Sequence, residues 1–461
     1  MRSLVVIASV TMGVFAAVFS IAFMNGMIAQ RFDAAIDQEI SHIQVSGESF
    51  RLNNDPLIFV PDIDKTTAII NSTPGISGNV KRIITGGMAV TAAKSAGVEI
   101  IGIDPVADKS IFSLNTTIID GTGDFFESDS RYDQVLIGQD LAKELGIIRF
   151  IIDSAILKRL GDEGIPGEVT VKLASQAGVR FSNEKKFNKA VRNVLSKKEA
   201  EKYFYRIKAE AWSYRERSGL TLTFLDKDNN QVDSRFRVSG IYDTKNSMFE
   251  MSRVFVEDET LRRFTSFGSN EYHQVIARLD DIEQTERITG ELKQKLPGVE
   301  VVNWKELQPD LAMMTEYVHQ IYGILMVIIM AALAFGIVNT MLMAVLERTK
   351  ELGMLAAIGM NRRKIFSMIM LESVFLSVIG GIAGMIVASV VILLTARNGI
   401  NFLQYAEGME AWGYTAHIFP QIDATFFIMM TVMVILTGIL SSVYPALKAL
   451  KLNPVEAIRT E

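Results

Sequence analysis

The sequence contains no cysteine and only four histidines. Without cysteine these residues form no disulfide, so an outer domain must rest on its own core. The same absence excludes thiol catalysis, thiolate metal ligands and acylation of a lipoprotein cysteine. His42, His273, His319 and His417 are far apart, and none has another ligand residue four positions away. We therefore expect no metal site and assign the histidines to the surface or to interfaces.

The motifs of common catalytic and nucleotide-binding sites are absent as well. The sequence has no phosphate-binding G-x-x-x-x-G-K-S/T loop, no G-x-S-x-G elbow, no H-E-x-x-H and no dinucleotide-binding glycine pattern. A turn explains paired acids such as Asp226 and Asp228. The net charge is −5, and no basic stripe with interleaved aromatic residues occurs, which argues against a nucleic-acid partner. We predict no catalytic residue, no directly bound cofactor and no enzyme activity.

Four long apolar segments dominate what is present. Hydrophobic residues make up 49% of the 461 residues and the mean hydropathy is +0.24, which fits membrane spans plus a sizeable soluble domain. The segments are residues 1–27, 322–346, 365–394 and 424–444. Each is long enough to cross the ~30 Å hydrocarbon core of a bilayer. The first also resembles a cleaved signal peptide, but its apolar run exceeds about 18 residues, so we favour a retained helix.

The charges of the connecting loops predict the topology. The loop after the third span, residues 396–423, has Arg397 as its only base against three acids, whereas the loop after the second span is basic. The bases of that second loop are Arg348, Lys350, Arg362, Arg363 and Lys364. Because basic loops stay in the cytoplasm, we predict that both termini are cytoplasmic. The large region between the first two spans then lies outside.

This outer region, residues 41–306, has the pattern of an α+β domain. Residues 220–225 and 236–241 are β-rich and flank a polar turn, which predicts a hairpin. Amphipathic segments at 28–40 and 307–319 adjoin the first two spans and predict stalk helices. The predicted fold class is a membrane protein with four transmembrane α-helices and a large α+β extracytoplasmic domain between helices 1 and 2.

Residues 147–218 form a long, mostly helical stretch rich in lysine and arginine. Its bases include Lys185, Lys186, Lys189, Arg192, Lys197, Lys198, Lys202, Arg206, Lys208, Arg215 and Arg217. We favour a solvated helical insertion whose charges bind nothing specific. The alternative is a surface for a partner or for the acidic headgroups of an apposed membrane, and such binding would weaken with salt.

Polar residues inside the predicted spans indicate helix contacts. Asn339 and Thr340 lie near the cytoplasmic half of the second span, where polar groups usually face a neighbouring helix. Glu372 lies about two turns into the third span. It is either functional or, as we favour, paired with a loop base such as Arg363 or Lys364.

A small-residue face follows in the third span. Gly380 and Gly384 have GxxxG spacing, with Gly381 beside them. Such a face lets helices approach closely. The sequence leaves open whether the partner helix lies within the subunit or across a dimer.

The loop between the second and third spans, residues 347–360, has the most specific pattern of the chain. Its middle predicts a short helix with Leu352, Leu355 and Ile358 on one apolar stripe. This helix is either an interfacial turn without a partner or a docking element for a soluble cytoplasmic protein. The loop resembles the E-R-x-x-E-I/L-G-x-L-x-A-x-G signature of the FtsX-like/MacB-type ABC transporter permeases. The matching residues are Glu347, Arg348, Glu351, Leu352, Gly353, Leu355, Ala357 and Gly359.

The resemblance covers the last third of the chain well, since residues 444–459 look like the family's closing motif. It covers the first span and the outer domain in layout. It implies a membrane subunit that works as a homodimer or with a related permease. Two copies of a separate ATPase would use the ATP and grip residues 347–360 as a coupling helix. Nucleotide-driven closure would then move the spans, the stalks and the outer domain.

The resemblance also implies a place and a set of tasks. The place is the bacterial inner membrane, among its lipids, with the large domain in the periplasm. The tasks are release of lipoproteins, as in the LolC/LolE-like members, or export of peptides and small toxic molecules. Two alternatives remain: ATPase-driven control of an outer enzyme such as a cell-wall hydrolase, and a membrane-anchored sensor. Family members usually begin with a basic cytoplasmic segment, so here that segment is missing or the start is placed late.

Overall fold

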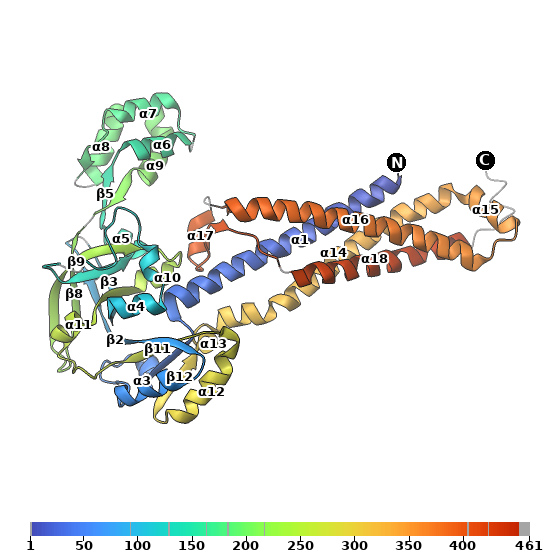
Figure 1. Cartoon of the computed structure of the whole chain (residues 1–461). Coiled ribbons are helices and arrows are strands. Elements are labelled where there is room, and N and C mark those ends of the chain that lie inside the picture. Colours follow the sequence, from blue (N-terminus) through green and yellow to red (C-terminus); the bar gives the residue numbers. More distant parts are fainter. Residues whose placement is uncertain are drawn as a thin grey trace. The chain divides into compact units, whose positions relative to one another are not determined.

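The computed structural model describes residues 2–92, 94–127, 130–162, 164–181, 184–215, 217–402, 405–422 and 424–450. It divides into two compact units. Unit 1 comprises Met1–Phe32, Gln308–Met409 and Tyr414–Glu461, and unit 2 comprises Asp33–Leu307 and Glu410–Gly413. Each unit is described by itself (Figure 1).

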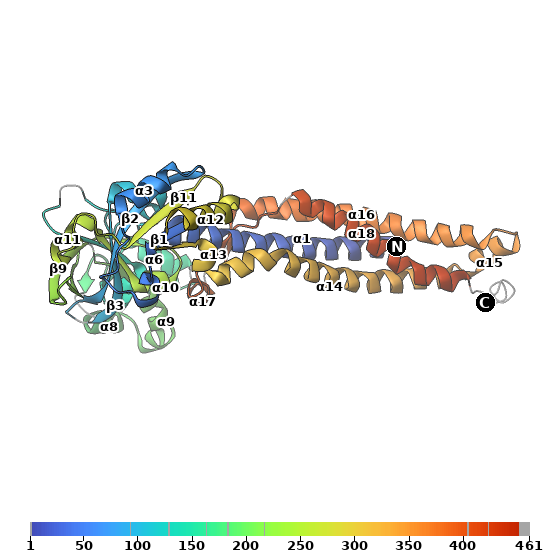
Figure 2. The same ribbon diagram turned by 90° about the horizontal axis from the view of Figure 1, so that it is seen from below.

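Unit 1 is a bundle of long helices (Figure 1 and Figure 2). They are α1 (Arg2–Ala34), α14 (Pro309–Glu347), α16 (Arg362–Asn398) and α18 (Ala424–Leu450). All four are long and apolar enough to cross a membrane, as predicted. The last helix continues through Pro445, although the predicted span ends at residue 444. A proline is tolerated inside a membrane helix when neighbouring groups satisfy the backbone that it disrupts.

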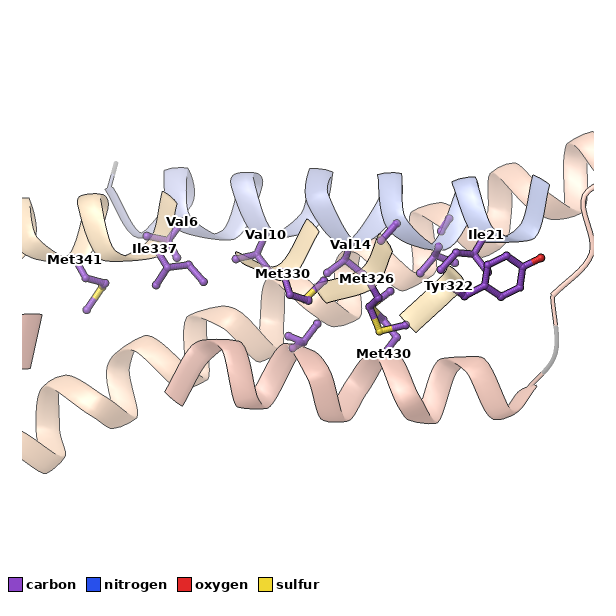
Figure 3. Packing of buried hydrophobic residues seen from close by; sticks show 14 of the residues in the cluster. Val6, Val10, Val14, Ile21, Tyr322, Met326, Met330, Ile337, Met341 and Met430 are labelled. Atoms are coloured by element: carbon purple, nitrogen blue, oxygen red, sulfur yellow. The ribbon is translucent and has the colours of Figure 1, made fainter. Parts of the chain in front are cut away.

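Apolar side chains from all four helices hold the bundle together. Figure 3 shows Val10 and Val14 of α1 close to Met326 and Met330 of α14, with Met430 of α18 beside them. The flexible methionine side chains fill the irregular space between the helices. The described sequence therefore forms one continuous core across the bundle.

Unit 2 is an α+β domain organised around β2 (Ile76–Val90). Its other main strands are β1 (Ile43–Gly47), β3 (Ser95–Ile103), β4 (Gln134–Gly138), β8 (Gly219–Leu225), β9 (Gln231–Tyr242), β10 (Arg253–Glu257), β11 (Gln274–Leu279) and β12 (Val299–Asn303). The first half of β2 pairs with β11, and its second half pairs with β3 and β8. One sheet therefore has the order β12-β1-β11-β2, and the strands β2-β3-β10-β4-β9-β8 close into a ring.

Helices complete unit 2. They are α2 (Phe50–Asn53), α3 (Ile63–Ser72), α4 (Pro105–Ile111), α5 (Gln139–Glu144), α10 (Ser247–Ser252), α11 (Asp258–Thr265), α12 (Thr285–Lys295) and α13 (Trp304–Leu307). Ile70 of α3 and Leu292 of α12 pack on Ile43 and Val275 of the four-stranded sheet. The predicted hairpin is confirmed, since β8 and β9 pair as antiparallel neighbours.

The basic insertion folds as a subdomain with its own apolar core, in which Leu173, Phe187 and Ile207 are fully buried. Its helices are α6 (Ser154–Asp162), α7 (Gly167–Ala174), α8 (Glu184–Val194) and α9 (Lys197–Glu210). A small antiparallel sheet, absent from the prediction, joins β5 (Ile148–Ile151) to β6 (Arg180–Phe181) and β7 (Trp212–Tyr214). A core of this kind makes the insertion a folded element and not a loose loop.

Two histidines of unit 2 were assigned wrongly, because His42 and His273 are buried. The backbone N–H of Leu279 donates to Nδ1 of His42 at 3.2 Å, and that of Ile84 donates to Nδ1 of His273 at 2.9 Å. Both rings must therefore be neutral in the folded chain. Burial lowers the pKa of each ring from 6.5 to about 4, helped at His42 by the nearby charge of Arg278.

We expect His42 and His273 to destabilise unit 2 as the pH falls from 6.5 to 4, and the buried Glu250, whose pKa burial raises to about 8, to offset part of this loss. Above pH 6.5 both histidines are neutral in the folded and unfolded chain. Below it the unfolded chain takes up protons that the folded chain refuses until about pH 4. Each depressed pKa costs roughly 3 kcal/mol once the pH is below both values. Denaturant unfolding of a Trp212→Phe/Trp412→Phe chain, in which the buried Trp304 is the remaining tryptophan, measures this loss by fluorescence.

Two matched variants test whether a buried histidine causes this pH dependence of stability. His273→Asn keeps an acceptor for the backbone N–H but cannot titrate, so it should remove about half of the histidine contribution and leave that of His42. His417→Gln changes an exposed ring and should leave the dependence as it is. If His273→Asn retains the full acid sensitivity, the ring of His273 does not contribute to it.

Candidate functional site

The loop predicted as a coupling element forms a short helix, α15 (Thr349–Ala357), between α14 and α16. Leu352 anchors it, since this side chain is 7% exposed and belongs to the core of the bundle. Gly359 ends it with φ at +94°, a conformation that favours glycine. The N–H of Met360 then donates to the carbonyl of Leu355 at 3.0 Å, which closes the helix end.

The apolar stripe predicted on this helix is only partly correct. Leu352 is buried and Leu355 half-buried, but Ile358 is 84% exposed. Met354 is 52% exposed as well. Ile358 follows the last helical residue and precedes the glycine turn, so the helical period no longer fixes its direction. The loop thus presents two large apolar side chains on the side away from the bundle.

The remaining signature residues are polar or small. Glu351, Ala357 and Gly359 are exposed, and Gly353 is buried against the bundle. Glu347 is exposed at the last turn of α14. The signature therefore combines a buried anchoring side with an exposed side.

Glu372 pairs with a base of this loop, as favoured, although the base is Arg348 and not one of the two examples, Arg363 and Lys364. Its carboxylate accepts hydrogen bonds from Nη1 of Arg348 at 3.1 and 3.4 Å. Arg348 lies at the junction of α14 and α15, and α16 returns past that junction. Neither Arg363 nor Lys364 has a described ion pair to Glu372. The bridge therefore ties the start of the loop helix to α16.

The glycines of α16 pack within the chain, which settles the question that the sequence left open. A Cβ on Gly380 would lie 2.8 Å from Cβ of Val10, and one on Gly384 would lie 2.7 Å from the carbonyl oxygen of Thr11. The Thr11 hydroxyl donates to the carbonyl of Gly380 at 3.1 Å. Gly381 approaches α18, where its Cβ would lie 2.8 Å from Val434. The small-residue face of α16 thus packs against α1 and α18.

Asn339 faces no other helix among the described residues, so the neighbouring helix that was expected for it is not found within this part of the chain. Its side chain is exposed on α14, whereas the Thr340 hydroxyl donates to the carbonyl of Gly336 in the same helix. Gly336, Phe335 and Met343 are exposed on the same length of α14. One side of α14 therefore carries a polar amide and a glycine that the described residues leave exposed.

A cavity of about 160 Å³ lies between α1, α14 and the start of α18. Ile21, Tyr322, Phe426 and Met429 form much of its apolar lining, and Asn25 adds a polar group. Sequence reasoning missed this site. The signal available to it was a set of polar residues, such as Asn25, near the outer ends of apolar runs.

Among the described residues, no group of three or more His, Asp or Glu side chains is placed to hold a metal. No constellation of a nucleophile with a base emerges from the hydrogen bonds in that part of the chain either. The site is therefore a loop helix, α15, that is anchored in the bundle and has an exposed apolar side. The helices behind it pack against each other through glycines.

Comparisons with known proteins bear on this site directly. Residues 323–454 match the family model described as FtsX-like permease C-terminal, which includes α15 and the loop around it. The chain is 29% identical over 294 residues to the "ABC transporter permease YtrF" of Bacillus subtilis, covering 59% of this chain and 66% of that relative. It is 34% identical over 156 residues to the "Macrolide export ATP-binding/permease protein MacB" of Chlorobium luteolum, covering 34% of this chain and 21% of that relative.

A solved structure is similar to part of the chain. It is the extracellular domain of the noncanonic ABC-type transporter YknZ, with 13% identity and a TM-score of 0.29, covering 57% of this chain and 98% of that one. The chain spans less than two thirds of the length of the two curated relatives named above. The family match and the two relatives confirm the resemblance inferred from residues 347–360.

Proposed function

We propose, from the match of residues 323–454 to the FtsX-like permease domain and the similarity to ABC transporter permeases, that the chain is the membrane subunit of a complex driven by a separate ATPase chain. The chain is a multi-pass protein of the inner membrane with its large domain outside. The observation that carries the proposal is the exposed apolar side of α15, formed by Met354 and Ile358. The basic residues around α15 assign it to the cytoplasm.

The ATPase grips α15 and moves the helices behind it. Leu352 and the Arg348–Glu372 bridge fasten the loop to the bundle, so that a push on α15 reaches α14 and α16. Glycine contacts couple α16 to α1 and α18. Binding energy on the cytoplasmic side therefore biases the arrangement of helices that lead to the outer domain. The permease binds no cofactor itself, and ATP is used by its partner.

The cargo is an apolar or lipid-bearing molecule, as in lipoprotein release or export from the periplasm. The cavity between α1, α14 and α18 supports this class, because its lining is largely apolar and lies at the outer ends of the helices. Control of an outer enzyme is the second function that the same mechanical coupling allows. Identification of what binds the outer domain decides between the two.

The direct test is affinity purification of the full-length protein from its native cells, with a non-hydrolysable ATP analogue and a crosslinker. We expect an ABC ATPase among the recovered proteins, together with a lipoprotein or an outer partner. Recovery of a cell-wall hydrolase in place of cargo would favour the regulatory function. Absence of any ATPase would contradict the proposal and leave the anchored sensor as the better description.

The complex contains two permease subunits that meet through α14. An exposed amide such as Asn339 is costly in lipid, and an exposed Gly336 allows close approach of a second helix. A second copy of this chain, or a related permease, covers both residues at once.

The absence of cysteine makes this contact testable with single thiols. We expect Gly336→Cys to form a disulfide-linked dimer in membranes after mild oxidation, because the two α14 helices pass close together there. Phe375→Cys, at a 67% exposed position of α16, is the matched control and should stay monomeric. Non-reducing gels of membranes measure both. A crosslink to a chain of different mass indicates a related permease, and equal crosslinking of the two variants would contradict this interface.

A further inference from the structure

Unit 2 contains a polar cavity of about 280 Å³ on one face of its sheets. Gln44 of β1 shows which face this is. It lies between Ile43 and Val45, whose side chains pack under α3 and α12, and side chains alternate along a strand. Gln44 therefore points to the opposite face, where it lines the cavity.

The lining comes from neighbouring strands in register. Gln274 of β11 lies directly opposite Arg82 of β2, and Glu99 of β3 lies opposite Arg253 of β10. All four line the cavity, and Arg51 adds a third guanidinium from α2. Arg51 is exposed, which marks the side from which a ligand enters.

Arg82 is the most deeply buried of these bases, at 4% exposed. Its Nη2 donates to Asp108 at 2.8 Å, and its guanidinium lies 4.2 Å from the ring centre of Phe112. Its Nε is buried and has no hydrogen-bond partner in the described part of the chain. Oδ2 of Asp108 is likewise buried without a hydrogen-bond partner among the described residues, so this ion pair keeps one donor and one acceptor unsatisfied.

The other two guanidinium groups are also only partly used by the described residues. Nε of Arg253 donates to Glu99 at 3.1 Å, and Nε of Arg51 donates to Glu300 at 3.1 Å. A guanidinium has five N–H donors, so most remain available. The two carboxylates that line the cavity are each engaged through at least one oxygen, whereas Oδ2 of Asp108 beside Arg82 is not. Glu99 is paired with Arg253, and the buried Glu39 accepts from Asn246 at 2.9 Å.

We propose that this cavity binds a compact ligand through an oxyanion, either a carboxylate or a phosphate. Three arginines with unused N–H groups, and two glutamine amides beside them, supply the donors that such oxygens require. The volume is near the lower limit for small-molecule sites, which restricts the ligand to a few heavy atoms beyond the anion. The carboxylates that already neutralise the arginines limit how much charge the ligand carries.

Such a ligand would bind where the two sheets of unit 2 meet along β2. Arg82 is the residue at which β2 passes from its pairing with β11 to its pairing with β3. A ligand that bridges Gln274, Arg82 and Arg253 therefore fastens the two sheets to each other. This inference stands apart from the proposed function, because it requires neither an ATPase nor a cargo.

Isothermal titration of the full chain in detergent, at constant ionic strength, tests the site with inorganic phosphate and with acetate as probes. We expect saturable binding of at least one anion at one site per chain. Saturation by phosphate alone identifies a phosphate ester as the ligand class, and saturation by acetate alone identifies a carboxylate. If neither anion saturates at concentrations well above millimolar, the proposal is overturned.

Two substitutions in the lining and one outside it assign the binding. Arg253→Gln and Gln274→Leu should each weaken it by about tenfold or more, the usual effect of losing a charge-assisted hydrogen bond. Arg287→Gln removes an exposed arginine of α12, on the other face of the sheet, and should change nothing. Melting curves confirm that all three fold. Unchanged affinity in both lining variants, or equal weakening in Arg287→Gln, would show that the anion binds elsewhere.

Discussion

Replacing Gly380 by leucine should disturb the packing of α1 on α16 and strongly destabilise unit 1. A Cβ at this position would lie 2.8 Å from Cβ of Val10 and 3.0 Å from the carbonyl oxygen of Ile7. Val10 is 1% exposed, so it has no free space to move into. Overpacking of a core typically costs about 1–3 kcal/mol, and a contact with backbone adds to it because the helix must shift as a whole.

Substitutions at the neighbouring glycines should destabilise unit 1 to different extents. Gly384→Leu should be as severe, since its Cβ would meet the Thr11 carbonyl oxygen at 2.7 Å. Gly381→Ala should be milder, because its nearest atom belongs to the side chain of Val434, which can rotate. Gly323→Leu is the matched control in α14, where a Cβ has nothing within 4 Å.

Melting temperature and size-exclusion profile in one detergent measure the series. We expect Gly380→Leu and Gly384→Leu to aggregate or to melt many degrees lower, and Gly323→Leu to match the parent chain. Equal melting of Gly380→Leu and Gly323→Leu would mean that α1 does not pack on the glycine face. The prediction has a large expected effect because α1 is tied to the bundle mainly through this face and the apolar core around it.

The spans and the α15 helix were predictable because their signals are local. Hydropathy over about 20 residues suffices to identify a membrane helix, and the signature of residues 347–360 is continuous in sequence. The glycine face of α16 was predictable as a face, but its partner was not. Val10 and Thr11 are separated from Gly380 by most of the chain. The periodicity of a sequence identifies a helix face but not the helix that packs against it.

The errors have the same origin. His273 looks like any polar residue in sequence, and its burial follows from the backbone of Ile84, which is 189 positions away. Glu372 does pair with a base of the loop, but the fold brings Arg348 to it from the end of the preceding helix and not the nearer Arg363 or Lys364. Ile358 fitted a helical period that Gly359 interrupts. In each case a tertiary contact or a backbone turn overrode a local pattern.

Replacing Met354 and Ile358 by glutamate should abolish association with the ATPase while leaving the permease folded. These side chains are 52% and 84% exposed, so the chain itself gains little from them. In a docked complex they would be buried, and a carboxylate placed in an apolar interface without a partner is strongly unfavourable. We expect recovery of the ATPase with the double variant to fall by more than about tenfold, as for loss of an interface hot spot.

The control separates a docking role from a general effect of charge. Val106→Glu places a carboxylate at an 82% exposed position of α4 in unit 2, and it should leave recovery of the ATPase unchanged. Leu352→Glu should lower both recovery and melting temperature, because Leu352 is buried in the bundle core. The double variant differs by losing the ATPase at an unchanged melting temperature. Full recovery with Met354→Glu/Ile358→Glu would exclude α15 as the docking helix, whatever its resemblance to the family signature.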